Sequence, residues 1–248
     1  MNRRDLLATL AMTAAAADAQ ESHPATPETT YVPKAHLVDD RRFLHDFMDE
    51  FAFVDLVTPA PTLRITHIPV LLDRSAGSFG TIHGHISAQN PQIAAFDQKQ
   101  EAVIVFRGPH GYISPAWYEN RRAVPTWNFA VVHASGRLKA VREPKALHAF
   151  LSRLINKFER YQGTDYDFSK LPDAYVNGML TAIVGFEMEI ERLEGKFKLG
   201  QERSDGDRQG ILTHLDKARH ERSLRDLTDS FYKYRASANT KTDPAGGD

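Results

Sequence analysis

The chain repeatedly alternates apolar and other residues with a period of two, and this pattern constrains its fold more than any other feature. In residues 79–88, Ile82 and Ile86 share one face while Thr81, His83 and His85 share the other. In residues 184–191, apolar side chains alternate with Gly and Glu, which predicts a half-buried strand despite the helix preference of glutamate. Further strands are predicted in residues 51–58, 63–72, 102–106, 127–134, 137–141 and 196–199.

Short turns join most of these strands, and amphipathic segments lie at the start, middle and end of the chain. Ser135-Gly136 predicts a hairpin between residues 127–134 and 137–141, and Gly108-Pro109 is expected to end the strand before it. Helices are predicted in residues 40–51, 93–98, 143–158, 171–179 and 207–227. The pattern predicts a β-rich α+β protein, an antiparallel barrel or sheet with peripheral helices.

Composition and missing motifs exclude several classes of function. The 248 residues include no Cys, so disulfides, thiolate catalysis and cysteine-ligated metals are excluded. The formal net charge of -1 provides no global basic field for nucleic acid. The sequence has no P-loop, no dinucleotide-binding glycine motif and no nucleophile elbow, so redox chemistry would have to come from a bound cofactor.

The N-terminus differs in composition from the rest of the chain. Residues 1–19 have a basic start, an Ala-rich apolar run and a small-x-small end at Ala17-Asp-Ala19, which predicts a secretory signal peptide. Arg3-Arg4 before Leu6-Leu7 fits the twin-arginine type. We therefore expect a periplasmic protein, with a linker at residues 20–30, a folded domain at 31–234 and a disordered tail at 235–248.

Residues 112–129 hold both tryptophans of the chain, together with two Tyr, a Phe and two Pro. Flat aromatic faces beside a backbone fixed by proline are suited to hold a flat aromatic ligand. The alternative is a hydrophobic corner between two strands.

Polar side chains in the predicted strands offer two further sites. His83 and His85 project from one strand face, and His67 and His133 could approach them from neighbouring strands, which would suit a metal or haem. The alternatives are contacts to a cofactor or a hydrogen-bonded polar lining. Arg64, Thr66 and His67 could clamp a phosphate, or form a solvent-facing strand edge.

Specific motifs then point to a family. Thr66-His-Ile-Pro69, Gly84-His85 with Asn90-Pro-Gln92, Tyr112-Ile-Ser-Pro-Ala-Trp-Tyr118, Val124-Pro-Thr-Trp-Asn-Phe129 and Gly195-Lys-Phe-Lys-Leu199 occur in order. Together they resemble the PaiB-type FMN-binding "negative transcriptional regulator" family over residues 31–227. The resemblance implies an antiparallel six-stranded Greek-key split β-barrel of the pyridoxamine-phosphate-oxidase-like kind. It also implies a homodimer that binds FMN in the cleft between subunits.

The resemblance also implies which residues contact FMN. The strand from Arg64 to Ile68 would lie along the flavin and the ribityl chain, and the aromatic segment would contact the ring. Other residues would line the phosphate or the flavin edge. The implied cofactor-binding residues are Arg64, Thr66, His67, Ile68, His85, Ser87, Asn90, Thr126, Trp127, Asn128, Lys196, Lys198 and Gln201.

Two departures from the family separate this chain from its relatives. Members commonly carry Ala-Arg after Gly-His-x, where this chain has Ser87 and Ala88, and losing a charge-assisted bond would weaken FMN binding by ~1–3 kcal/mol. The predicted export signal excludes transcriptional repression. The leading hypothesis is an exported FMN protein, an oxidoreductase acting on a small substrate if it is an enzyme. The alternatives are a cytoplasmic regulator or ligand sensor, and a haem or metal protein using His83 and His85.

Overall fold

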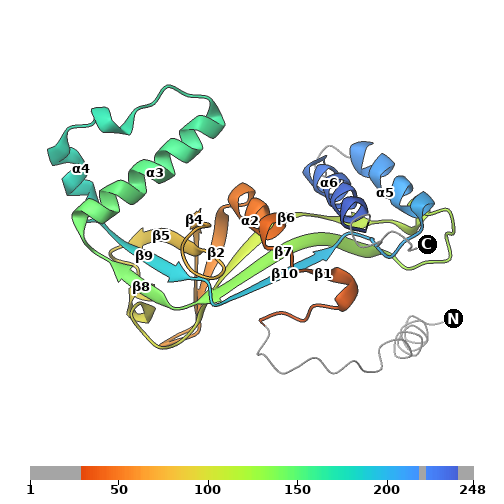
Figure 1. The fold of residues 1–248 in the computed structure, drawn as a ribbon, viewed down its shortest axis with the longest axis horizontal. Helices are drawn as coiled ribbons and strands as arrows, with labels where there is room; N and C mark the ends of the chain where they lie inside the picture. The colour runs from red at the N-terminus through yellow and green to blue at the C-terminus, as the bar shows by residue number, and fades with distance from the viewer. Residues whose placement is uncertain (1–28, 218–221, 240–248) are drawn as a thin grey trace, which may run out of the picture.

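The computed structural model describes residues 29–217 and 222–239, which form two antiparallel sheets with surrounding helices (Figure 1). The strands are β1 (Leu37–Val38), β2 (Phe53–Thr58), β3 (Arg64–Pro69), β4 (Leu71–Asp73), β5 (Thr81–Ser87), β6 (Ala102–Ile113), β7 (Thr126–Gly136), β8 (Leu138–Val141), β9 (Ile183–Glu189) and β10 (Arg192–Lys198). The α-helices are α2 (Arg41–Glu50), α3 (Pro144–Gln162), α4 (Asp173–Leu180), α5 (Asp205–Lys217) and α6 (Arg222–Asn239). Single 3₁₀ turns are η1 (Lys34–His36), η2 (Pro91–Ala95), η3 (Pro115–Trp117) and η4 (Phe168–Lys170).

Connections between consecutive strands join the two sheets. The six-stranded sheet has the order β1-β10-β7-β6-β2-β3, and the four-stranded sheet has the order β4-β5-β9-β8. The chain changes sheets between β3 and β4, between β5 and β6, between β7 and β8, and between β9 and β10. Such corners are typical of barrel-like sandwiches. Within the described ranges, strand pairing does not close into a single barrel.

The predicted hairpin around Ser135-Gly136 is wrong. β7 pairs with β6 and β10, whereas β8 pairs with β9 in the other sheet. A Cβ atom on Gly136 would lie 2.2 Å from the Glu189 carbonyl oxygen, so the chain passes β9 too closely for any side chain. Gly136 therefore lies where the chain crosses from one sheet to the other. A Ser-Gly pair is equally typical of a hairpin turn, so the local sequence does not distinguish the two.

β6 continues past Gly108-Pro109, where a strand end was predicted. The pairing of β6 with β7 shifts register between Arg107 and His110 and then resumes to Ile113. A bulge of this kind accommodates a proline, which cannot donate a ladder hydrogen bond. The longer strand carries the aromatic segment into the sheet, opposite Trp127.

Helices are present where residues 40–51, 143–158 and 171–179 predicted them, whereas the helix predicted at 93–98 is wrong, because that segment forms only the 3₁₀ turn η2, which ends at Ala95. Asp40 caps α2 by accepting a hydrogen bond from the Phe43 amide, and the Glu143 carboxylate accepts two amides at the start of α3. The single helix predicted at 207–227 is instead two helices, α5 and α6. α6 continues to Asn239, so residues 235–239 of the expected disordered tail are helical.

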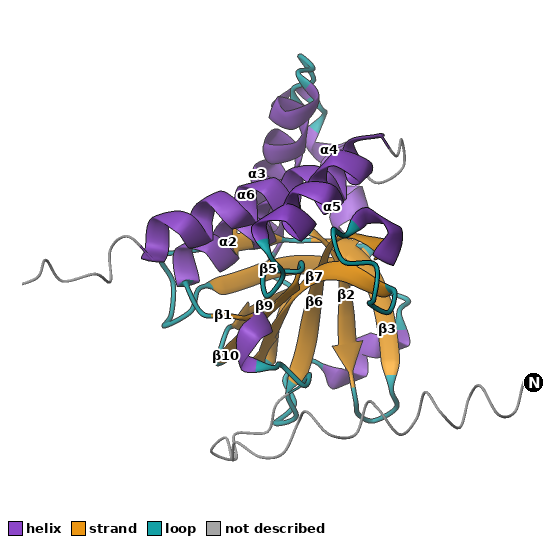
Figure 2. Ribbon diagram, turned by 90° about the vertical axis from the view of Figure 1, so that its right-hand side faces the viewer, coloured by secondary structure: helices purple, strands orange, loops and turns teal. Residues whose placement is uncertain are grey.

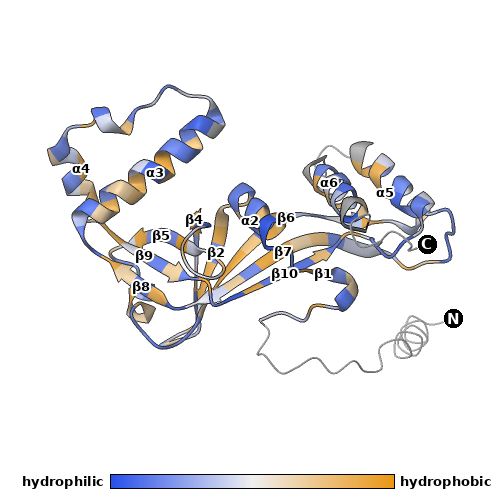
Figure 3. Ribbon diagram, viewed as in Figure 1, coloured by the Kyte–Doolittle hydropathy of each residue, from blue (hydrophilic) through white to orange (hydrophobic). Residues whose placement is uncertain are grey.

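The main core lies on the inner face of the six-stranded sheet. Leu56, Ile104, Val132 and Phe197 point inward and are fully buried, and Phe197 packs against Phe231 of α6. Figure 2 shows α2, α5 and α6 together above one side of this sheet, and Figure 3 shows that hydrophobic residues concentrate in the central strands. We call the opposite side the outer face. It carries Asp55, Val57, Ile65, His67, Val105, Arg107, Tyr112, Trp127, Phe129, Val131, His133, Glu194 and Lys196.

The expected signal peptide at residues 1–19, most of the linker and residues 240–248 lie outside the described residues. Among the helices that the structure does describe, none combines the length and apolar character that a membrane crossing requires.

Candidate functional site

The first group of predicted site residues gathers where β3 meets the segment after β5. The Asn90 amide donates to the Thr66 hydroxyl at 2.9 Å, and the Thr66 hydroxyl donates to the Gln92 side-chain oxygen at 2.5 Å. Arg64 begins β3, the edge strand of the six-stranded sheet. Its guanidinium makes no hydrogen bond or ion pair with another described residue. A free cation beside the Asn90 amide, which keeps a second N–H, could hold a phosphate.

Gln92 organises this group, although sequence reasoning did not select it as a site residue. Its side chain is 1% exposed, and Nε2 donates to the Leu56 carbonyl and the Thr58 hydroxyl, both at 3.1 Å. Gln92 therefore ties η2 to β2 and, through Thr66, to β3. The sequence feature that could have identified Gln92 is its place in the Asn90-Pro-Gln92 motif. Pro91 starts η2 in this motif, and the Asn90 side chain accepts a hydrogen bond from the Gln92 amide.

A carboxylate on the neighbouring strand orients His67. The His67 Nδ1 atom lies 2.5 Å from Asp55 Oδ1, and the other Asp55 oxygen lies 2.9 Å from the Arg107 guanidinium. Since a carboxylate only accepts, Nδ1 carries the proton in this contact. The Nε2 atom then remains for a ligand or substrate on the outer face, where the His67 side chain is 60% exposed. Sequence reasoning missed Asp55 and Arg107.

The second group lies on β7 and β10. The Lys198 ammonium donates to the Thr126 hydroxyl at 2.7 Å, and Lys196 lies over the rings of Tyr31 and Phe129. Trp127 is 52% exposed on the outer face, with Tyr112 edge-on to its ring. An exposed indole on the same pair of strands as two ammonium groups, one of them bonded to the neighbouring Thr126, could stack on a flat anionic ligand.

Three predicted residues have mainly internal contacts. Gln201 donates to the Ala35 carbonyl and accepts the Leu199 amide, and this closes the end of β10. Asn128 points into the core and is 1% exposed. Ile68 is buried in the main core.

A single copy of the chain keeps the two groups apart. β3 is one edge of the six-stranded sheet, and β6 and β2 lie between it and β7. One ligand could contact both groups together only if a second chain contributed one of them.

The two histidines of β5 share a face, as predicted, and that face is turned toward α3. His85 packs edge-on against Phe150 at 5.7 Å and lines an apolar cavity of about 310 Å³ with Tyr175 and Met179. Ser87 lies at the exposed end of the same face and accepts the Gln89 amide. Within the part of the chain that the structure describes, no three His, Asp or Glu side chains are grouped as metal ligands would be.

His133 belongs to a small network on the outer face. Thr29 donates its hydroxyl proton to Glu194 at 2.6 Å, so the His133 Nδ1 atom, 2.9 Å from the same hydroxyl, must donate. Burial lowers the pKa of His133, and the nearby Glu194 partly opposes that shift. His133 is thus a neutral structural group near neutral pH, held by its neighbours.

Several residues implied as flavin ligands have buried polar atoms without a partner. These atoms are Arg64 Nε, His85 Nδ1 and Asn128 Nδ2, and no described residue bonds to them. A buried polar atom without a partner costs about 1–3 kcal/mol, which an external ligand could remove. Asn128 lies in the core and His85 faces α3, so of the three only the Arg64 Nε donor is placed to meet a phosphate at β3.

Comparison with known proteins identifies the family. Residues 30–192 match the family described as "Putative FMN-binding domain". The chain belongs to this FMN-binding family. It is 31% identical to the protease synthase and sporulation protein PAI 2 of Bacillus subtilis over 186 residues, covering 75% of this chain and 88% of that protein. It is 32% identical to an uncharacterized protein of Aspergillus fumigatus over 202 residues, covering 63% of this chain and 77% of that protein.

Solved structures resemble this member of the FMN-binding family at low sequence identity. The flavocytochrome Anf3 from Azotobacter vinelandii superimposes with a TM-score of 0.49 at 13% identity, covering 70% of this chain and 76% of that chain. A FAD and heme binding protein from Mycobacterium smegmatis superimposes with a TM-score of 0.48, at 13% identity, covering 69% of this chain and 78% of that chain.

Proposed function

We propose that this protein binds FMN in a cleft between two copies of the chain. The observation that carries the proposal is the unpaired Arg64 guanidinium beside the Thr66–Asn90 pair, far across the sheet from Trp127 and Lys198. A phosphate on one copy's Arg64 and an isoalloxazine ring against the other copy's Trp127 would use both groups at once. The two sheets and their crossing strands would form the six-stranded Greek-key split barrel of each subunit.

Apolar side chains on the outer face support the pairing of two copies. Phe53 is 68% exposed, Ile65 56% and Trp127 52%, and all three lie on the side of the sheet away from α2, α5 and α6. Exposed apolar area of this kind commonly marks an interface. A two-fold pairing through this face would present Ile65 and His67 of each copy's β3 to the other copy, and Arg64, on the opposite side of this edge strand, would reach the ligand around the sheet edge.

We further propose that the bound protein is an oxidoreductase for a small substrate. FMN, when bound, supplies two-electron redox chemistry. Arg64 and the second N–H of the Asn90 amide would orient its phosphate, and Trp127 would cover the ring and exclude water from it. His67, held by Asp55, can hold or release a proton at Nε2 beside a substrate on the outer face.

Reconstitution tests the proposal. The purified chain mixed with excess FMN should retain a flavin absorbance band near ~450 nm after gel filtration and lose it on dithionite reduction. Trp127→Ala should weaken FMN binding about tenfold or more, because stacking of a flat ring on an aromatic side chain contributes ~1–3 kcal/mol. The urea midpoint of unfolding should stay nearly unchanged, since the Trp127 side chain is exposed. A colourless protein after reconstitution, or equal losses of binding and stability in the variant, would reject the proposal.

We also propose export through the twin-arginine route, supported by Arg3-Arg4 and the Ala17-Asp-Ala19 pattern. Residues 1–30 fused to a reporter should deliver it to the periplasm, and Arg3→Lys with Arg4→Lys should keep it in the cytoplasm. Retention of the unchanged fusion in the cytoplasm would instead favour a regulator or sensor.

A further inference from the structure

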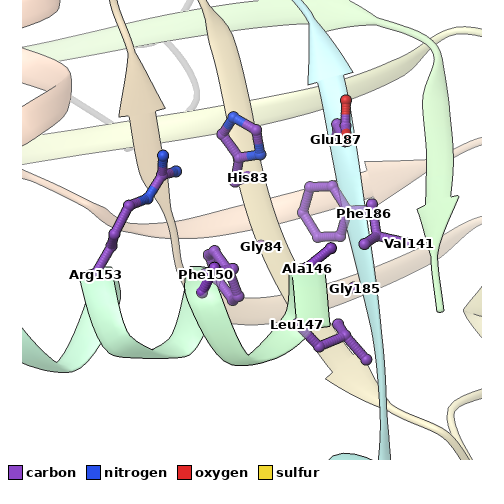
Figure 4. Close-up of a pocket in the computed structure, with 11 residues that line it drawn as sticks. His83, Gly84, Val141, Ala146, Leu147, Phe150, Arg153, Gly185, Phe186 and Glu187 are labelled. Atoms are coloured by element: carbon purple, nitrogen blue, oxygen red, sulfur yellow. The ribbon is translucent and has the colours of Figure 1, made fainter. Parts of the chain in front are cut away.

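A cleft of about 240 Å³ lies between α3 and the four-stranded sheet. None of its lining residues is an implied flavin ligand, and of those ligands His85 is a neighbour, because it packs on the lining residue Phe150. His83 and Glu187 line it from β5 and β9, and Leu147, Phe150 and Arg153 line it from α3. Figure 4 shows the polar groups of Arg153, His83 and Glu187 toward one end and Leu147 toward the other. The cavity is smaller than those for drug-sized ligands, ~300–1,000 Å³, and suits a small metabolite.

The charged groups of the cleft are not paired with each other. Arg153 makes no hydrogen bond or ion pair with another described residue, although it is close enough to lower the pKa of His83. Asp73, the other nearby carboxylate, accepts two hydrogen bonds from Ser75 in its own turn. Glu187 is exposed at the rim, opposite Lys139 on β8.

The apolar end is formed by close packing of α3 on β9. A Cβ atom on Gly185 would lie 2.6 Å from the Leu147 side chain, so the glycine lets the helix approach the sheet there. Beyond this contact, Val141, Leu147 and Phe150 form the apolar wall. One end of the cleft therefore offers a free cation and a free carboxylate, and the other offers hydrocarbon.

We propose that this cleft binds a small apolar α-amino acid. The Arg153 guanidinium pairs with the α-carboxylate, Glu187 accepts a hydrogen bond from the ammonium group, and the apolar side chain packs against Leu147, Val141 and Phe150. A simple carboxylic acid would leave Glu187 facing an anion, and a simple amine would leave Arg153 facing a cation, so the zwitterion satisfies both charges.

Three probes with one hydrocarbon skeleton test the proposal on the full chain by NMR chemical-shift titration. L-Phenylalanine should bind more tightly than 3-phenylpropionate, which lacks the ammonium group, and than phenethylamine, which lacks the carboxylate. Arg153→Met should weaken phenylalanine binding about tenfold or more and leave phenethylamine binding unchanged, since a charge-assisted hydrogen bond is lost. Glu187→Gln should weaken phenylalanine and leave phenylpropionate unchanged.

Arg160→Met is the matched control, because Arg160 is an exposed arginine on the same helix outside the cleft. It should bind phenylalanine as the unaltered chain does. Tight binding of phenylpropionate, an unchanged affinity in Arg153→Met, or no saturable binding of phenylalanine would overturn the proposal. Phenylalanine binding should also persist at saturating FMN, and displacement by FMN would overturn the assignment of a separate site. Failure of FMN to bind leaves this result intact.

Discussion

At the scale of single residues, Arg64 is the side chain that we expect to contribute most to phosphate binding at β3. Arg64→Met should weaken FMN binding about 10- to 100-fold, because a charge-assisted hydrogen bond contributes ~1.5–3 kcal/mol. Riboflavin, which lacks the phosphate, should bind the variant and the unaltered protein equally. Fluorescence quenching of each flavin measures both affinities.

Arg142→Met is the matched control for this measurement, because Arg142 is an exposed arginine paired with Asp97 and remote from β3. It should leave both affinities unchanged. An equal loss of FMN and riboflavin binding in Arg64→Met would show that Arg64 contacts the ring or the fold, and not the phosphate.

Buried histidines should make the protein acid-sensitive. Burial lowers the pKa of His83, His85 and His133, and the Arg153 charge adds to the effect at His83. The unfolded chain, with histidine pKa values near ~6.5, therefore takes up protons at a higher pH than the folded chain. The free energy of unfolding should therefore be highest above about pH 7. It should decrease as the pH falls through 6.5 toward the lower pKa values that these histidines have in the folded protein.

Urea midpoints measured between pH 5 and 8 check this sign. Replacing all three histidines by Gln should flatten the slope between pH 7 and 5.5, whatever it does to the stability at pH 7.5. A protein that is more stable at pH 5.5 than at 7.5 would contradict the linkage.

Connections between strands depend on close backbone approach, and Gly136 is the clearest case. Gly136→Ala would place a methyl group against the Glu189 carbonyl of β9, so it should lower the free energy of unfolding by about 3 kcal/mol, the upper end of typical overpacking costs. Gly178 of α4 is the control, because a Cβ atom there meets no atom within 4 Å. Gly178→Ala should raise stability by ~0.4–1 kcal/mol. Similar changes in the free energy of unfolding for the two substitutions, measured by chemical denaturation, would show that Gly136 is not required for the close approach to β9.

The assembly as a whole should be required for the flavin site. Ile65→Lys on the outer face should yield a folded monomer that no longer retains FMN, because β3 and β7 of one copy cannot reach one ligand together. Light scattering coupled to gel filtration measures the mass, and absorbance in the same run measures the bound flavin.

Phe79→Lys provides the control for this variant, since Phe79 is 38% exposed in the turn before β5 and its carbonyl contacts His45 of α2, on the side away from the outer face. It should remain a dimer with FMN bound. A monomeric Ile65→Lys protein that keeps its flavin would place the whole site within one chain.

Local patterns predicted most strands and helices of this protein correctly. The alternation in residues 184–191 identified β9 despite its glutamates, because side chains of a strand point to opposite faces in turn. The motifs also identified the FMN-binding family. The family resemblance implied that Arg64, Thr66 and Asn90 all contact FMN, and in the structure a hydrogen bond joins Asn90 to Thr66.

Only the tertiary structure decided how the strands pair and which faces the side chains share. Ser135-Gly136 has the sequence of a turn, yet pairing over long sequence distances makes it a crossing between sheets. The partners of His67, the role of Gln92 and the cleft beside Arg153 all join segments far apart in the chain. Periodicity and turn preference act over a few residues, whereas these contacts depend on which distant strands and helices pack together.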